Sequence, residues 1–444
     1  MHTHHRFIQM SALALGIVGA LAIGQAQASG FQLKENSVKA QGRSFAGSGV
    51  AKDDASVVVN NPASMTEFEG TTVQNDVTVI DLGFNFEGRG TDALGRPLTG
   101  GDGGDAGGLT PVPALSVIHK LDNGLTLGAM IHAPFGLKTE YDRGWQGRYK
   151  ALKSEVKIVD LTLSGAYEIV PDHLSVGGGL IIEKAEVTLS NAVDFGTLLF
   201  TSAVPGFTPQ SADGEAVITG DNVGLGWIVG VNFRPTDKLA LGLSHRSEVD
   251  HDLEGSADWT VPGNARTVLN GVGRGALFND GAVRAKLTTP SITSFSASYD
   301  INEAFTVYGN YDMTDWHSIE EVRIDFVNPD PDSVEDFSWK DTIFWSVGAD
   351  WRISETLTLR GGYAFDETPT SIATRTPRLP DEDRNWYSLG LTWNATESLE
   401  INAAYTRIKP NTPRIRTTNS FRHTLVGEYE SSVNLFGVSA QLKF

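Results

Sequence analysis

Few side chains in this sequence of 444 residues have the types and spacing that covalent catalysis requires. The chain has no cysteine, which excludes a thiolate nucleophile, a Cys-ligated zinc ion and a disulfide framework. Ser244 and His245 are adjacent, but neighbouring residues of a strand point to opposite faces and cannot act as a nucleophile and its base. We therefore expect no enzyme, no catalytic residue and no cofactor.

Acidic residues are the next candidates, as ligands of a metal ion. The stretches 101–108 (GDGGDAGG) and 328–333 (NPDPDS) carry several aspartates but match no complete calcium-ligand spacing. We expect solvated loops there and no metal site. The chain has 35 Lys and Arg against 54 Asp and Glu, a net charge of −19, so we expect no nucleic acid partner either.

A third group of side chains has the character needed to bind an apolar molecule. Residues 193–207 read VDFGTLLFTSAVPGF, with five large apolar side chains: Phe195, Leu198, Leu199, Phe200 and Phe207. This stretch is too apolar for a loop that only faces water. Such side chains either bind a hydrophobic ligand or pack against lipid or a neighbouring loop.

The elements that position these residues belong to an exported protein. Residues 1–28 have a polar start with Arg6, a short apolar stretch and an Ala26-Gln27-Ala28 cleavage site, and this pattern predicts a cleaved secretory signal peptide. No later stretch reaches 18 consecutive apolar residues, so we expect no transmembrane helix. The exported chain is then either soluble in the periplasm or crosses the outer membrane as a β-barrel.

Period-two alternation favours the barrel. In residues 344–351 (FWSVGADW), one face carries Trp345, Val347, Ala349 and Trp351. The other face carries Ser346, Gly348 and Asp350, and the segments 226–233, 294–299 and 389–393 alternate similarly. A soluble sandwich would carry charged residues on its second face, whereas Ser and Gly dominate here, as expected for a barrel lumen.

The turns indicate how many strands there are. Five strands end in an aromatic residue just before a short polar turn: Tyr167, Phe233, Tyr299, Trp351 and Trp393. Such rings at a common level predict an interfacial girdle. Six short turns alternate with seven long connections, at about 87–110, 138–154, 189–222, 254–283, 317–336, 367–384 and 409–431. We therefore predict an all-β fold, a 14-stranded antiparallel transmembrane β-barrel of the bacterial outer membrane with both termini on the periplasmic side.

The last strand supports an outer-membrane location. Residues 434–444 (NLFGVSAQLKF) alternate up to the terminal Phe444, which resembles the signal that barrel-assembly machinery reads. We expect that machinery, outer-membrane lipid and lipopolysaccharide as partners, and a monomer.

A barrel of this size needs a filled lumen or leaves a channel. We expect residues 71–444 to form the barrel and residues 29–70 to fold back into it as an N-terminal hatch, or plug. In VVVNNPASM (57–65) the apolar run is strand-like, and Asn61, Pro62 and Ala63 end it, because proline removes a donor and restricts the residue before it. This motif is the candidate gating element of the hatch.

Several stretches resemble the outer-membrane long-chain fatty acid transporters, the FadL family. The N-terminal segment shares a G-F-Q-L start, an A-x-D-D-A step at Ala51–Ala55 and N-P-A at Asn61–Ala63. The similarity continues in 132–141 (HAPFGLKTEY), 245–249 (HRSEV), 360–369 (RGGYAFDETP) and 379–390 (LPDEDRNWYSLG), and in Leu435-Phe436-Gly437.

The resemblance implies a transport route for a hydrophobic small molecule. Extracellular loops after strands five and seven capture the ligand, which would here involve the apolar residues of 193–207. The ligand then binds inside the barrel, with Phe31 among its contacts, and leaves sideways at a kink in strand three, here Pro134-Phe135-Gly136. Independently of the family, proline and glycine weaken a strand where they interrupt its ladder, although an ordinary bulge would look the same in sequence.

The substrate head group stays open at this level. The positions that correspond to the family's basic head-group residues are Asn191 and Glu335, neither of them basic, with Lys184 or Lys340 as possible replacements. We therefore expect a long-chain fatty acid transporter, with a channel for neutral hydrophobic compounds such as monoaromatic hydrocarbons or alkanes as the alternative. A general diffusion porin is the third option, and it predicts appreciable conductance.

Overall fold

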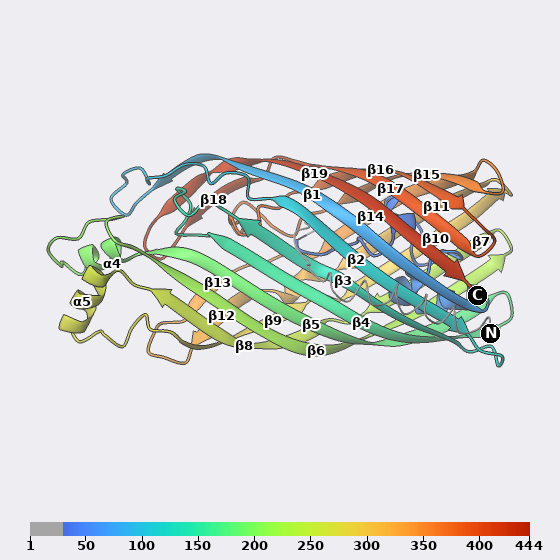
Figure 1. Ribbon diagram of the computed structural model, residues 1–444, viewed down its shortest axis with the longest axis horizontal. Coiled ribbons are helices and arrows are strands. Elements are labelled where there is room, and N and C mark those ends of the chain that lie inside the picture. The colour runs from blue at the N-terminus through green and yellow to red at the C-terminus, as the bar shows by residue number, and fades with distance from the viewer. Residues whose placement is uncertain (1–29) are drawn as a thin grey trace, which may run out of the picture.

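The computed structural model describes residues 30–444, and the predicted signal peptide, residues 1–28, lies outside them. The described chain forms one closed antiparallel ring in which nineteen strand segments make up fourteen wall strands (Figure 1). β1 pairs with both β2 and β19, which closes the ring. The predicted fold class is therefore confirmed.

Nine wall strands are continuous. They are β1 (Thr71–Thr91), β2 (Gly108–Lys120), β3 (Thr126–Glu140), β4 (Lys153–Val170), β5 (Leu174–Asp194), β6 (Asp213–Thr236), β15 (Leu357–Asp366), β16 (Arg384–Asn394) and β19 (Thr424–Lys443).

The other five wall strands consist of two segments each. They are β7 (Leu239–Arg246) with β8 (Val249–Thr260), β9 (Gly281–Thr289) with β10 (Ile292–Asn302), β11 (Phe305–Thr314) with β12 (Glu321–Phe326), β13 (Ser333–Asp336) with β14 (Thr342–Arg352), and β17 (Leu399–Pro410) with β18 (Arg414–Thr418). The wall is thus interrupted repeatedly between β7 and β14, and one of these interruptions matters below.

Side-chain alternation places the wall in lipid as the sequence predicts. The five girdle rings Tyr167, Phe233, Tyr299, Trp351 and Trp393 are each 45–51% exposed on the outside, and Phe436 and Val438 of β19 are exposed as well. Ser346 of β14, by contrast, is buried on the lumen side. Among residues 30–444, no helix is long and apolar enough to span a membrane.

The segment that precedes β1 lies inside the ring, near the end where β1 begins and β19 ends (Figure 1). It contains α2 (Val38–Gln41), α3 (Val57–Asn60) and the 3-10 helix η1 (Pro62–Glu67). Salt bridges tie it to the wall, including Lys34 to Asp312 at 2.7 Å and Arg43 to Asp350 at 3.1 Å.

Two close backbone approaches seat this inner segment. A methyl group added to Gly42 would lie 2.9 Å from Gly390 Cα, and one added to Gly362 of β15 would lie 2.2 Å from the Arg43 backbone. Only glycine leaves room for this contact, so the segment packs against the wall without intervening side chains.

The strand-like interpretation of residues 57–59 is wrong, because Val57–Asn60 forms the short helix α3. Val57 and Val58 are fully buried between the wall and the rest of the segment, so the run is apolar because it is enclosed and not because it alternates. Pro62 sits in the first turn of η1, where its missing N–H costs nothing.

The longest connections gather at the opposite end, which carries the helices α4 (Phe195–Thr201) and α5 (Gly263–Gly271) (Figure 1). A third short element, η2 (Trp316–Ser318), interrupts the wall between β11 and β12. β1 begins and β19 ends at the other end of the barrel, which the sequence predicts to be periplasmic. The end that carries α4 and α5 is therefore the extracellular one.

Candidate ligand-binding site

An apolar cavity of about 130 Å³ lies inside the barrel, toward the extracellular end. Strands β3 to β6, β8, β9 and β12 contribute aliphatic side chains to it, and most of these belong to one buried cluster. The aliphatic lining consists of Leu137, Val156, Val187, Leu189, Ile218, Leu253, Leu287, Ile319, Val322, Ile324 and Leu379. A cavity of this composition suits an alkyl chain or an aromatic ring.

Phe31 links this cavity to the predicted kink in β3. Its ring lies 5.0 Å from the Trp316 ring, 5.7 Å from Phe135 and 5.9 Å from Trp339. Phe31 and Trp339 line the cavity, whereas Phe135 belongs to β3. The predicted ligand residue Phe31 therefore lies between the cavity and Phe135, at the kink that the family resemblance implies to be the exit.

The kink at Pro134-Phe135-Gly136 is an interruption of the wall. β3 pairs with β2 only from Thr126 to Ile131, and its register on β4 shifts between His132 and Phe135. Above that point the inner segment takes the place of β2: Leu33 N donates to Pro134 O at 2.7 Å, and Gly136 N donates to Phe31 O at 2.8 Å. The backbone of residues 31–33 thus covers the gap between β2 and β3 from inside.

A polar end closes the apolar cavity. Arg378, on the connection between β15 and β16, lines it together with Asn191 and Glu335. Its guanidinium donates to neutral oxygens: Ser154 Oγ at 2.9 Å, Asn191 Oδ1 at 3.2 Å and Lys153 O at 3.2 Å. Burial lowers the pKa of Arg378, but a guanidinium stays charged in proteins.

Lys150 lies close enough to this polar end to interact electrostatically with it, although it does not line the cavity. Burial lowers its pKa, and the nearby charges of Glu335 and Arg378 act on it in opposite directions. The lining itself thus carries one cation, Arg378, near one carboxylate, and the two positions considered from sequence, Asn191 and Glu335, are not basic.

Sequence reasoning missed Arg378 because nothing near it in the chain marks it. It contacts residues about 190 to 225 positions away, on β4 and β5. The two lysines considered instead do not reach the cavity: Lys184 pairs with Glu186 and Lys340 with Glu367, and both are more than half exposed.

A buried charged network lies behind the kink. Arg246 Nη1 donates to Asp160 Oδ2 at 2.7 Å, and Arg246 also binds Glu183. Thr289 and His251 contact Glu183 at 2.7 and 2.9 Å, and the Arg246 guanidinium lies 5.7 Å from the centre of the Phe135 ring. This network joins the five strands β4, β5, β7, β8 and β9, and it packs against Phe135 of β3 beside the interrupted ladder.

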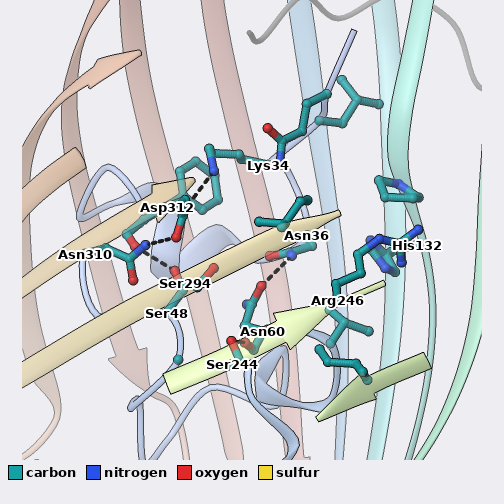
Figure 2. Close-up of a pocket in the computed structure, with 18 of the residues that line it drawn as sticks. Lys34, Asn36, Ser48, Asn60, His132, Ser244, Arg246, Ser294, Asn310 and Asp312 are labelled. Atoms are coloured by element: carbon teal, nitrogen blue, oxygen red, sulfur yellow. Dashed lines mark hydrogen bonds and ion pairs between the residues drawn. The ribbon is translucent and has the colours of Figure 1, made fainter. Parts of the chain in front are cut away.

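A polar pocket separates the network from the inner segment (Figure 2). Arg246 and His132 lie on one side of it, and Lys34 with Asp312 lies on the other (Figure 2). Ser244 faces the pocket and donates to Asn60 O at 2.6 Å, whereas His245 contacts Thr293 and the Trp227 ring on the lipid side. Ser244 and His245 therefore point away from each other, as expected.

The predicted loop residues pack against a neighbouring loop. Phe195 and Leu199 of α4 are buried in one cluster with Ala265 and Leu269 of α5, and Leu198 and Phe207 pack on its edge. Phe200 is 37% exposed. The loops after strands five and seven thus meet, and most of the apolar surface that the sequence showed is used in joining them.

The predicted gating residues lie against β5, β6 and the inner segment. Asn61 Nδ2 donates to Gly49 O at 2.9 Å and to Val231 O at 3.0 Å, and its Oδ1 caps η1 through Ala63 N. Pro62 and Ala63 pack on Gly177. None of these contacts involves Pro134, and the motif lies beside the wall of β5 and β6.

One group of possible metal ligands does occur among residues 30–444. Donor atoms of Asp315, His317 and Asp341 lie within 4.8 Å of one another. Sequence spacing could not show this group, because it joins η2 and the residue before it to Asp341, which directly precedes β14 in the neighbouring wall strand.

Comparisons with known proteins agree with this architecture. Residues 19–444 match the family described as outer membrane protein transport protein (OMPP1/FadL/TodX). The chain is 28% identical over 415 residues to outer membrane protein P1 of Haemophilus influenzae, covering 88% of each chain. It is 26% identical to the long-chain fatty acid transport protein of Escherichia coli K12, covering 88% of this chain and 91% of that one.

The fold has equally clear relatives. A crystal structure of a Pseudomonas aeruginosa FadL homologue superimposes with a TM-score of 0.87 at 25% identity, over 94% of this chain and 100% of that one. The Ralstonia pickettii toluene transporter TbuX shares the fold with a TM-score of 0.64 at 18% identity, over 91% and 98% of the two chains.

A closed wall of fourteen strands around an apolar cavity defines the class, an outer-membrane β-barrel that transports hydrophobic molecules. Within that class, the chain belongs to the OMPP1/FadL/TodX family of Gram-negative bacteria. The relatives named here are described as transporters or outer-membrane proteins, and none as an enzyme.

Proposed function

We propose that this protein takes up long-chain fatty acids across the outer membrane. The observation that carries the proposal is the joining of an apolar cavity to a cationic end, where Arg378 lines the cavity and its guanidinium donates to neutral oxygens. A long-chain fatty acid has two matching parts, an alkyl chain for the apolar cavity and a carboxylate for the cationic end. Its alkyl chain gains about 0.8 kcal/mol per buried CH₂, and its head group gains charge-assisted hydrogen bonds.

The alternative substrate is a neutral hydrophobic compound, as in the toluene transporter that shares this fold. Such a compound would fill the same aliphatic lining but leave Arg378 bonded only to neutral oxygens. The buried charge therefore favours the fatty acid.

The proposed route runs from the cavity past Phe31 to the gap at Pro134-Phe135-Gly136. A ligand held by an alkyl chain leaves slowly for water but passes into the bilayer at little cost, so sideways release suits this substrate. In the proposal, residues 29–70 act as the hatch, because residues 30–70 lie inside the ring and the backbone of residues 31–33 covers the gap. Capture would begin at the exposed Phe200, beside the packed cluster that contains Phe195, Leu198, Leu199 and Phe207.

The remaining partners are part of the proposal as well. Phe444, which is 61% exposed at the end of the wall, is available to barrel-assembly machinery during insertion. The girdle rings contact membrane lipid, and lipopolysaccharide surrounds the extracellular end of the wall. Because the whole route lies within one barrel, we propose that a monomer suffices.

The test is the affinity of the purified protein for oleate, oleyl alcohol and toluene, before and after Arg378→Gln. We expect the substitution to weaken oleate binding about tenfold to a hundredfold, the range that charge-assisted hydrogen bonds span, and to leave oleyl alcohol within about twofold. Lys340→Gln, which removes an exposed cation paired with Glu367, is the matched control.

Two results would contradict the fatty acid proposal. One is oleate affinity that is unchanged in Arg378→Gln although the variant keeps the heat-modifiable migration of a folded barrel. The other is toluene bound more tightly than oleate by the parent protein, which would favour the neutral hydrocarbon channel.

A further inference from the structure

The wall has a second interruption, between β9 and β12. On its periplasmic side, below the break, the β10–β11 ladder ends with the pair Ile292–Thr314. On its extracellular side, above the break, the β9–β12 ladder begins with the pair Ala285–Ile324. Among the described residues between these pairs, one backbone hydrogen bond crosses the break, from Asp315 N to Ser291 O at 3.1 Å. Pro290 contributes to the break because it has no N–H to donate.

Two aliphatic side chains fill this break. Leu287 of β9 and Ile319, just after η2, line the apolar cavity on the inside. The same two residues line a hollow of about 350 Å³ on the outside, together with Lys286, His317 and Glu321. Leu287 is 8% exposed and Ile319 3% exposed, so these two side chains form the partition between cavity and exterior.

The break lies at the level of the membrane surface. Directly below it, Phe295, Tyr311 and Met313 expose apolar side chains to lipid. At and above it, the outward residues are charged, including Lys286 at 90% side-chain exposure and Arg323 at 47%. An amphiphile in the outer leaflet holds its head group at this level, with its alkyl chain just below.

The backbone on both sides of the break is held in place. On the η2 side, His317 Nδ1 lies 2.6 Å from Asp341 Oδ1, and His317 N donates to the same oxygen at 3.0 Å. Phe337 N and Ser338 N donate to Glu320 O. On the other side, β9 pairs with β8 along its whole length. Opening the break therefore requires that two side chains change rotamer, and not that a ladder comes apart.

From this geometry we infer that the break between β9 and β12 is a lateral entry port, through which the alkyl chain of a single-chain amphiphile passes from the membrane surface into the apolar cavity. Leu287 and Ile319 close the port when it is empty. Lys286, on its outer lip, faces the head group of an anionic amphiphile. The inference rests on the proposed uptake function and adds a route to it that bypasses the extracellular loops.

The test uses the double variant Leu287→Cys/Ile319→Cys, since the parent chain has no cysteine. A short bis-maleimide then joins the two side chains across the break. Because both side chains also line the cavity, the cross-linked protein is compared with the same double variant whose cysteines carry N-ethylmaleimide, and oleate affinity is measured for each. In proteoliposomes we expect the cross-link to slow oleate uptake about fivefold or more, as for a blocked gating step, and by more than any loss of affinity explains.

The control pair is Phe295→Cys/Tyr311→Cys, which faces lipid across the continuous β10–β11 ladder. Its cross-link should leave uptake unchanged. Uptake that is equally fast with and without the Leu287–Ile319 cross-link would overturn the port, and so would a loss of affinity that fully accounts for the slower uptake. If the parent protein itself takes up no oleate, the proposed function fails instead.

Discussion

The two gaps in the barrel wall are closed by different means. Between β2 and β3 the ladder stops at Ile131, and the backbone of residues 31–33 pairs with β3 in place of the missing strand. Between β9 and β12 the ladder is interrupted as well, but only the side chains of Leu287 and Ile319 fill the space. One gap is covered by hydrogen-bonded chain and the other by two aliphatic groups.

The difference predicts how each gap opens. Uncovering the β2–β3 gap breaks backbone hydrogen bonds worth about 0.5–1.5 kcal/mol each and displaces Phe31 from its aromatic neighbours. Opening the β9–β12 gap changes rotamers alone. We therefore expect passage at β2–β3 to depend on the ligand and on the inner segment, and passage at β9–β12 to depend on side-chain volume.

The largest effect should come from deleting residues 31–68. The deletion removes the cover of the β2–β3 gap and empties the lumen, but it leaves Leu287 and Ile319 in place. We expect the conductance in planar bilayers to rise about tenfold or more, because a fourteen-strand barrel without a plug holds a water-filled channel.

Insertion of the shortened chain is checked by its heat-modifiable migration. A variant that inserts normally but conducts ions no better than the full chain would show that the segment is not a hatch, and would reopen the diffusion porin as an option.

A smaller effect is expected from deleting Ala133, within the register shift between His132 and Phe135. Removing the extra residue lets β3 run straight on β4 and pair with β2 beyond Ile131. We expect release of oleate into the bilayer to slow about tenfold, with affinity within about twofold, since the cavity itself is untouched. Ala133→Gly, which keeps the extra residue, is the control. Normal release from the deletion variant would make the kink an ordinary bulge.

The smallest effect concerns pH at the polar end of the cavity, which both gaps share. Burial lowers the pKa of Lys150 below its ordinary 10.5, so the ammonium is present at neutral pH and is lost as pH rises through this lowered pKa. Its attraction for a carboxylate is lost with it. Oleate affinity should therefore fall a few-fold between about pH 7 and pH 10, whereas Lys150→Gln should show a flat profile. An equal slope in both proteins would place Lys150 outside the site.

Much of the barrel could be predicted because its signals are local. Alternation in 344–351 and the rings that precede short turns report the two faces and the membrane level directly, and both are seen in the exposed Trp351 and Trp393. The helix at Val57–Asn60 could not be predicted in the same way, since a short enclosed run of valines has the composition of a strand.

Part of the candidate site can be located from the sequence. The family resemblance points to Phe31 and to the β3 kink, and the rings of Phe31 and Phe135 lie 5.7 Å apart in the structure. Arg378 carries none, because its role depends on a long connection that folds back to β4 and β5. The β9–β12 break was equally hidden, since it arises from the offset of two ladders and not from any one motif.

The contact between Gly42 and Gly390 has a consequence for biogenesis. The inner segment is synthesised first, yet it is seated on β15 and β16, which are synthesised much later. The seat of Gly42 therefore does not exist until β15 and β16 have joined the wall. We expect the segment to become ordered late in folding, although it leaves the ribosome first, so that completion of the wall decides when the lumen is filled.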